Sequence, residues 1–490
     1  MSTFSGISTA LSSLIAQRQA LEVSGQNIAN SNTVGYTRQR ASISSLPAAS
    51  VSSMFSTNNG PGQGTQVTGI ERLGDVFIDT RVRSETAGSA YLAARASAYT
   101  SLEQGVGEPS KTGLSAQLSN LWAGFHDVGN TPNKDSARSA LLESANAVVD
   151  RIATLYGAAG TQWTQARTTT VALVDQVNTT AANVADLNTR ILSITNTGGS
   201  ANELMDQRDL LVTQLSGLVG ATARVRDNGT VDVLVAGNAL VSGATTKALT
   251  VTGPTLFSGA TGALASAGPP PVTAIQGASV GVAWEKPDGT TSSAVGLEGG
   301  RVAGLLSVLA PPSAGAGGML TEAAASYDAL ATKLADSVNA LHSGATTVGG
   351  ATGINFFAFD ATKPALTLSV AITLPSDIAV ATRGKGALDG SVADQIAALG
   401  AAPDGPDAAW SSTVVQLGVR TASGTSRATV AEASRASAAS QQLAQMSVST
   451  DEESTNMLAY QRAYEGSARV LTAIDAMLDT LINRTGLVGR

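Results

Sequence analysis

The stretch NIANSNTVGYTRQR, Asn27 to Arg40, ends a regular apolar pattern and decides how the chain is organised near its start. Before it, apolar residues recur at alternating steps of three and four, which is the heptad spacing of a helix that pairs with another helix. The stretch itself is polar, and Asn tolerates the left-handed backbone that ends a helix. We therefore expect a helix that stops near Asn30 and Asn32, followed by a turn in which Gly35 takes a positive φ.

The seam of this first helix is predicted to lie on six apolar residues. These are Phe4, Ile7, Leu11, Leu14, Leu21 and Ile28. Arg18 and Gly25 occupy the two intervening positions of the heptad pattern. A glycine inside a helix costs about 1 kcal/mol relative to alanine. Gly25 is therefore either a tolerated weak point or a place where another helix comes close, and the sequence favours neither.

The C-terminal segment repeats the heptad pattern. Its predicted seam consists of Met457, Tyr460, Tyr464, Leu471, Ile474, Leu478 and Leu481. Asp451, Glu452 and Glu453 precede it, where carboxylates favour a helix N-terminus, and Thr450 is the expected cap with Glu453 as its capping-box partner. An apolar stripe on a lone helix needs cover, so we predict that the terminal helices pair with each other and with copies of themselves. In a dilute monomer we expect this bare two-helix arm to be poorly ordered.

Composition excludes several functional classes. The chain has 490 residues, a net charge of −7, only 14% charged residues and no cysteine. Nucleic acid is an unsuitable partner because phosphate binding needs concentrated Lys and Arg, and thiolate chemistry is excluded. The N-terminal residues lack the basic and apolar regions of a cleavable secretory signal, and no apolar run has the length of a membrane span. We expect no contact with a membrane, and if the protein leaves the cell it must use a route that does not read a Sec signal.

The interior alternates between helical and strand patterns. Residues 114–218 have helical periodicity, with an interruption expected near Gly157 and Gly160. The dipeptides Asn228-Gly229, Gly237-Asn238 and Asp288-Gly289 predict hairpin turns.

Helical patterns return in GGRVAGLLSVLA and TEAAASYDALATKLADSVNALHSG. Residues 345–420 are mixed, with a strand-like run PALTLSVAITL, and helix is expected again from about Thr425. The predicted fold is mainly α with an inserted β domain, built as nested domains. The domains are residues 1–60 with 446–490 as a coiled-coil core domain, 61–219 with 298–445 as a largely helical domain, and 220–297 as a β-rich outer domain.

Several blocks together resemble a known family. The heptad helix with NIANSNTVGYTRQR, and the terminal SVSTDEESTNMLAYQRAYEGSARVLTAIDAMLDTLI, are similar to the two ends of bacterial flagellar axial proteins. The interior blocks NELMDQRDLLVTQLS, LEGGRVAGLL, LATKLADSVNALHSG and GINFFAF resemble the hook-associated protein 1 (FlgK) family within that class. The characteristic residues of the DQRD block are Asp206, Gln207, Arg208 and Asp209.

The resemblance implies a structural subunit of the flagellum rather than an enzyme, with no cofactor or metal. Such a subunit is exported through the flagellar type III apparatus, with a dedicated chaperone bound near its C-terminus. It assembles with copies of itself in a helical tube at the hook–filament junction, with hook protein below, and a second junction protein and then flagellin above. Two alternatives stay open: another axial protein of the hook or distal rod, and a secreted enzyme or adhesin built on the β insert.

The polar residues favour structural roles. His126 and His342, which belong to no catalytic motif, are expected to be packing or capping histidines. On a helix Asp206 and Asp209 share one face while Arg208 points elsewhere, which favours an ion and hydrogen-bond patch on the helix surface that fixes inter-helix packing. The opening stretch is interpreted as a hinge between the core helix and the rest of the chain. Its residues are Asn27, Asn30, Asn32, Thr33, Gly35 and Tyr36, with Tyr36 as an amphipathic anchor. Arg38 and Arg40 are expected on a solvated face.

Overall fold

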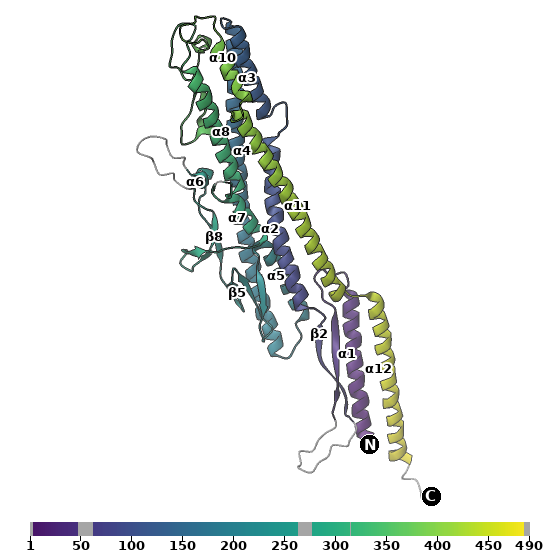
Figure 1. Cartoon of the computed structure of the whole chain (residues 1–490). Coiled ribbons are helices and arrows are strands. Elements are labelled where there is room, and N and C mark those ends of the chain that lie inside the picture. The colour runs from purple at the N-terminus through teal and green to yellow at the C-terminus, as the bar shows by residue number, and fades with distance from the viewer. Residues whose placement is uncertain (1–2, 48–61, 263–276, 314, 485–490) are drawn as a thin grey trace, which may run out of the picture.

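The chain folds into an elongated molecule with a long body and a narrower arm, and both termini lie at the free end of the arm (Figure 1). A computed structural model describes residues 3–47, 62–262, 277–313 and 315–484. The arm contains the first and last long helices, and the body contains the others. The predicted fold class, mainly α with an inserted β region, is confirmed.

The helices are α1 (Thr3–Ala29), α2 (Val76–Val106), α3 (Leu114–Asn130), α4 (Asp135–Asn196), α5 (Asn202–Val219), α6 (Phe257–Thr261), α7 (Gly300–Leu309), α8 (Met319–His342), α9 (Pro364–Thr367), α10 (Ser391–Ala397), α11 (Pro406–Met446) and α12 (Thr450–Asp479). The strands are β1 (Gln39–Leu46), β2 (Gly64–Arg72), β3 (Thr222–Val225), β4 (Val231–Val235), β5 (Asn238–Ser242), β6 (Thr245–Thr246), β7 (Leu249–Thr252), β8 (Gly281–Glu285), β9 (Thr291–Ala294), β10 (Phe357–Ala358) and β11 (Ser369–Val370).

The body is organised around α4, whose 62 residues form one continuous helix about 90 Å long. Buried side chains recur along it every three or four residues, from Leu141 to Ile191, so that it packs against neighbours over its whole length. The interruption expected near Gly157 and Gly160 was therefore wrong. Phe257 occupies the space over Gly160, where an added Cβ would lie 3.0 Å from its ring, and Thr161 and Thr164 bond helical carbonyls of this stretch.

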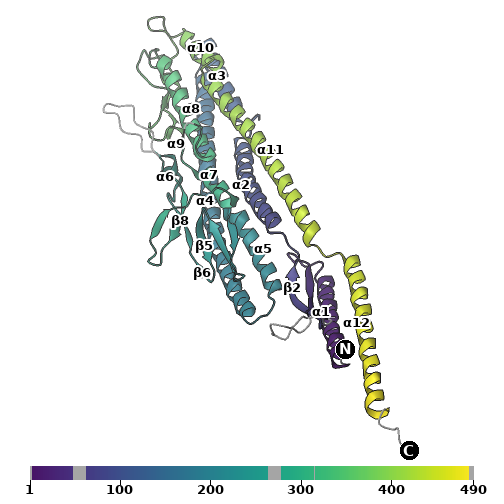
Figure 2. The ribbon, with the colours of Figure 1, turned by 60° about the horizontal axis from the view of Figure 1, so that its bottom comes forward.

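The β insert forms two antiparallel sheets, ordered β3-β4-β5-β6 and β7-β8-β9, beside the lower half of α4 (Figure 2). The hairpin turns at Asn228-Gly229 and Asp288-Gly289 are confirmed, and both glycines have positive φ. The third turn lies one residue earlier than expected, because Ala236 and Gly237 take the positive φ values and Asn238 already begins β5.

The region 345–420 is shorter than predicted because α11 begins at Pro406 instead of about Thr425. The small residues of this stretch allow close packing along α2, and Gly424 lies against Tyr99 and Ala96. The strand-like run is mostly not a strand, since it contains the short helix α9 and only two paired residues, Ser369 and Val370.

Candidate functional site: the arm and its joint

The terminal helices α1 and α12 lie side by side in the arm (Figures 1 and 2). The buried apolar positions of α1 are mainly small residues, Ala10, Ala16, Ala20 and Val23. Ser13 and Ser467 share a hydrogen bond of 2.8 Å between the helices, and an added Cβ at Gly6 would lie 2.9 Å from Cδ1 of Ile474. The close approach of another helix, which the sequence left open at Gly25, is therefore made at Gly6. Gly25 faces open space, so it is the tolerated weak point.

The predicted seam residues of α1 are only partly covered. Ile7, Leu14, Leu21 and Ile28 are partly buried, Leu11 is half exposed, and the side chain of Phe4 lies outside the described residues. The buried positions fall on a neighbouring stripe, because α1 packs against the strand β2 as well as α12.

On α12, one predicted seam residue is buried and most are partly covered. Ile474 is buried, Met457, Tyr460, Leu471 and Leu478 are partly buried, and Tyr464 and Leu481 are exposed. Other large apolar side chains of the arm also face solvent. Together with Leu11 and Leu481, the set that is 50% to 73% exposed includes Ile15, Leu458, Val470, Met477 and Ile482. We call these seven residues the arm surface.

A hairpin covers part of the arm that was predicted to be bare. Strands β1 and β2 pair in antiparallel register, with Gln39 opposite Arg72 and Leu46 opposite Gly64. The hairpin packs on α1, where Ser12 Oγ accepts a hydrogen bond from the amide of Thr65 at 3.2 Å. Sequence reasoning missed it, although residues 39–46 alternate polar and apolar positions around Ala41 and Ile43.

The signature residues close the turn that follows α1. Asn27 is buried, and its Oδ1 accepts hydrogen bonds from the Tyr36 hydroxyl and the Gln39 amide, each at 2.9 Å. Its Nδ2 donates to the Gln39 carbonyl at 2.8 Å, so the carboxamide pairs with the start of β1 as a strand neighbour would. Burial, with Glu203 nearby, raises the pKa of Tyr36 to about 12, and the hydroxyl therefore stays a donor.

The remaining signature residues shape the turn itself. Asn30 Nδ2 donates to the Gln26 carbonyl, and Thr33 Oγ1 donates to Asn30 Oδ1 at 3.2 Å. Gly35 has the expected positive φ of 81° and lies against Leu210 of α5, while Asn32 is exposed.

The DQRD block of α5 lies in a buried joint between arm and body. Asp206 Oδ2 accepts the amide of Thr37 at 3.0 Å, and Arg72 pairs with Asp206 and with Asp209, each at 2.8 Å. Arg208 donates to the Gly229 carbonyl at 2.7 Å and also pairs with Asp209 at 3.4 Å, so the expectation that it points elsewhere is met only in part. Gln207 is exposed.

The ion and hydrogen-bond patch predicted on this helix lies inside the molecule, because Asp206 and Arg208 are both buried. Burial raises the pKa of Asp206, against the opposing effect of Arg72, and lowers the pKa of Arg208. The function inferred for the patch, to fix packing, does agree with these contacts.

Arg38 connects the start of the hairpin to α12. Its guanidinium pairs with Glu452 and with Glu453, each at 2.7 Å, so the solvated face expected for Arg38 was wrong. Arg40 is exposed. The helix cap is Ser449, whose Oγ accepts from the Glu452 amide, rather than Thr450. The Glu453 side chain is therefore used for the ion pair and not for a capping box.

The two histidines have structural roles. His342 is buried, its Nδ1 bonds the Ile354 carbonyl and its Nε2 accepts the amide of Ala379, each at 2.8 Å. Burial lowers the pKa of His342, which keeps the ring neutral, as these two bonds require. His126 lies on α3 and contacts Asp394 at 3.1 Å.

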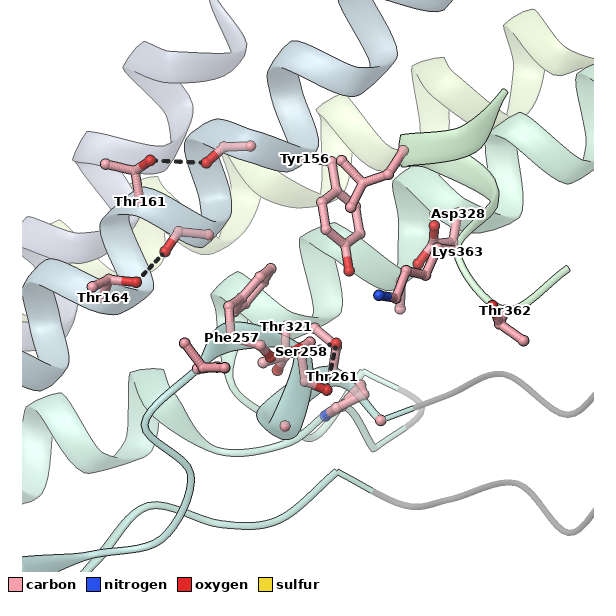
Figure 3. Close-up of a pocket in the computed structure, with 18 of the residues that line it drawn as sticks. Tyr156, Thr161, Thr164, Phe257, Ser258, Thr261, Thr321, Asp328, Thr362 and Lys363 are labelled. Carbon is pink, nitrogen blue, oxygen red and sulfur yellow. Dashed lines mark hydrogen bonds between the residues drawn. The ribbon is translucent and has the colours of Figure 1, made fainter. Parts of the chain in front are cut away.

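A groove of the described body has a volume of about 760 Å³ and is shown in Figure 3. It lies between α4, α6, α8 and the segment before α9, where Tyr156, Asp328 and Lys363 converge. Asp328 is buried and accepts the amide of Ala365 at 2.9 Å. This carboxylate thus holds the start of α9 in place. No nucleophile–base pair accompanies it among the described lining residues.

Three family models match the chain. The helical domain of the flagellar hook-associated protein FlgK matches residues 99–357, more than half of the chain. The chain belongs to the FlgK family. Residues 7–37 match the flagella basal body rod protein family, and residues 439–484 match the C-terminal family of the flagellar basal body rod proteins FlgEFG. The resemblance inferred from the sequence is confirmed.

Individual relatives agree with this assignment. The chain is 27% identical to flagellar hook-associated protein 1 of Bacillus subtilis over the full length of both. It is 31% identical to that of Escherichia coli over 50% of this chain and 44% of the relative. The structure of the flagellar hook junction protein FlgK from Burkholderia pseudomallei has the same fold, with a TM-score of 0.62 at 15% identity, and covers 76% of this chain and all of that chain.

The relatives are structural flagellar proteins, and this FlgK family member is a structural protein of the flagellum rather than an enzyme. Within the part of the chain that the structure describes, no helix is both long and apolar enough to span a membrane. The same described residues contain no group of three or more His, Cys, Asp or Glu side chains that could hold a metal ion.

Proposed function

We propose that the chain is a subunit of the hook–filament junction and polymerises through its arm into a helical tube on the distal end of the hook. The observation that carries this proposal is the arm surface, seven large apolar side chains exposed on α1, on α12 and on the short π-helix Thr480–Arg484 that follows α12. Several large apolar side chains exposed on the same elements are more than the scattered single ones that a surface normally carries, which favours an association site. Copies of the chain would cover them, with hook protein below and a second junction protein above.

The assignment to the junction, rather than to the hook or distal rod, rests on the body. Both chain ends match rod-protein families, as expected for any axial protein, while the helical domain model is that of FlgK. We keep the division into a core domain of residues 1–60 and 446–490, a helical domain and a β-rich outer domain as part of this proposal. Export through the flagellar type III apparatus, with a chaperone bound near the C-terminus, belongs to it as well.

The terminal helices are expected to fold fully only on assembly. Along α12 the buried residues are Glu453 and Ile474, so a single copy covers little of this helix. We predict low helicity and fast hydrogen exchange in both terminal segments of a dilute monomer relative to the polymer, in which copies cover the exposed side chains. Full protection of both segments in the monomer would contradict coupled folding.

The assembly proposal is tested by deleting residues 448–490 and by substituting the arm surface. The deletion should abolish polymerisation on isolated hook ends and chaperone binding while the body stays folded. Leu458→Ser with Met477→Ser should weaken polymerisation without altering the fold, since both side chains are exposed. Leu388→Ser, at an exposed leucine of the body, is the matched control. Junction assembly by the variant that lacks residues 448–490 would contradict the proposal.

A further inference from the structure

The boundary between arm and body is polar. The apolar cluster of the arm is built on Ala20, Val23 and Ala41, with Val67, Ile70 and Tyr460 packed against it. Among the described residues, the apolar clusters of the body contain no residue of α1, β1, β2 or α12. Polar contacts have narrower geometric requirements than apolar ones. The orientation of the arm is therefore set by a few hydrogen bonds and ion pairs.

One side of these contacts joins the hairpin to α5. The Thr37 amide donates to Asp206, and the Gln39 carboxamide donates to Glu203 at 3.2 Å and accepts from Asn202 at 3.0 Å. All three partners lie in the first two turns of α5. Arg72, at the end of β2, adds its pairs with Asp206 and Asp209 to the same side.

The other side joins the same segment to α12. Arg38 stands between Thr37 and Gln39, and in an extended chain adjacent side chains point in opposite directions. Its guanidinium holds Glu452 and Glu453, and its amide donates to the Met446 carbonyl at the end of α11, at 3.0 Å. The Glu453 side chain is only 3% exposed, so solvent and salt compete weakly with this pair.

We propose that Thr37–Gln39 is a two-sided coupling element that fixes α12 relative to the body. Thr37 and Gln39 hold the hairpin and α1 on α5. Arg38 then fixes α12 relative to them through its ion pairs. Arg38 is a positioning residue in this scheme. Loss of its ion pairs frees α12 alone, whereas loss of the α5 contacts frees the whole arm. The coupling is a property of a single chain and does not depend on the proposed assembly.

Distance measurements between spin labels on the full-length monomer test the coupling. The chain has no cysteine, so labels attach only at introduced cysteines. Thr179→Cys on α4 is combined either with Thr472→Cys on α12 or with Ser8→Cys on α1, all at exposed positions. Double electron–electron resonance then reports the α12–body and α1–body distance distributions separately.

Arg38→Gln should broaden the α12–body distribution and leave the α1–body distribution narrow. Asp206→Ala and Gln39→Ala should broaden both. Arg18→Gln, which removes the exposed pair with Glu22 on α1, is the matched charge control and should broaden neither. Should Arg38→Gln fail to fold, the double variant Glu452→Gln with Glu453→Gln removes the same pairs. If removal of the Arg38 pairs broadens neither distribution, or broadens both equally, the two-sided coupling is wrong.

Discussion

Replacing Asp328 with Asn should make the body more stable at neutral pH. This carboxyl lies at the base of the groove in Figure 3, where burial raises its pKa from the ordinary value of 3.8 to about 6. The amide of Ala365 favours the ionised form, but that effect is the smaller one. The folded chain therefore holds a proton on Asp328 at pH values where the unfolded chain has released it.

The sign of the pH dependence follows from this difference. Because the folded state binds more protons between about pH 4 and pH 6, the free energy of unfolding falls as pH rises through that window and levels off above it. Each tenfold change in an acid dissociation constant corresponds to about 1.4 kcal/mol. The rise in the pKa of Asp328 to about 6 therefore corresponds to a loss of about 3 kcal/mol at pH 7 relative to acidic solution.

Asp328→Asn removes this ionisation and keeps an oxygen that can accept the Ala365 amide. Urea unfolding from pH 4 to pH 8, followed by tryptophan fluorescence, measures the effect, since all four tryptophans lie in the body. The variant should match the wild type near pH 4 and exceed it by about 3 kcal/mol at pH 7. Asp336→Asn, at an exposed carboxyl of the same helix, is the control. A difference between Asp328→Asn and wild type that does not change with pH would refute the reasoning.

Four further substitutions test other parts of the fold. Gly300→Ala should cost at least about 2 kcal/mol in a urea titration, because φ is 83° and the new Cβ would lie 2.6 Å from the backbone of Gly220. Gly198→Ala, at a φ of 79° with open surroundings, should cost only about 1 kcal/mol. Arg138→Ala should lower the stability of the body by about 3 kcal/mol, since this buried guanidinium donates to three backbone carbonyls, and an unchanged melting curve would contradict this role. Ile474→Ala should speed hydrogen exchange in α12 and leave the urea midpoint of the body unchanged; a shifted body midpoint would show that the arm and body unfold together.

The sequence predicted the helical parts of the fold well, and its errors have identifiable causes. Glycine was treated as a helix breaker at Gly157 and Gly160, although the buried stripe on both sides continues the helix. The same bias delayed the expected start of α11. In each place tertiary packing outweighs a local propensity of about 1 kcal/mol. The three hairpin turns predicted in the β insert lie within one residue of their expected places because they depend on positive φ, which is a local property.

The joint could be predicted only in part. Asn27, Gly35 and Tyr36 act within one turn, so the signature could be interpreted locally. The partners of Arg38 and Asp206 lie more than 160 residues away in the chain, at Glu453 and Thr37. No periodicity within a segment carries that information. The available signal was a pair of charged residues without a local partner, Arg38 just after α1 and Glu453 in the first turn of α12.

The arrangement of small and large residues in the arm has an energetic consequence. The contact between α1 and its neighbours buries alanines, each of which contributes much less apolar area than a leucine or isoleucine. Four of the nine large apolar residues of α12, and two of α1, stay exposed instead. Pairing within one chain thus leaves large apolar side chains of the arm that can be buried elsewhere. On the proposed function, this makes the arm stable in the polymer and labile in the monomer. Replacing the alanines buried between α1 and its neighbours with larger apolar residues should then stabilise the single chain and reduce its tendency to polymerise.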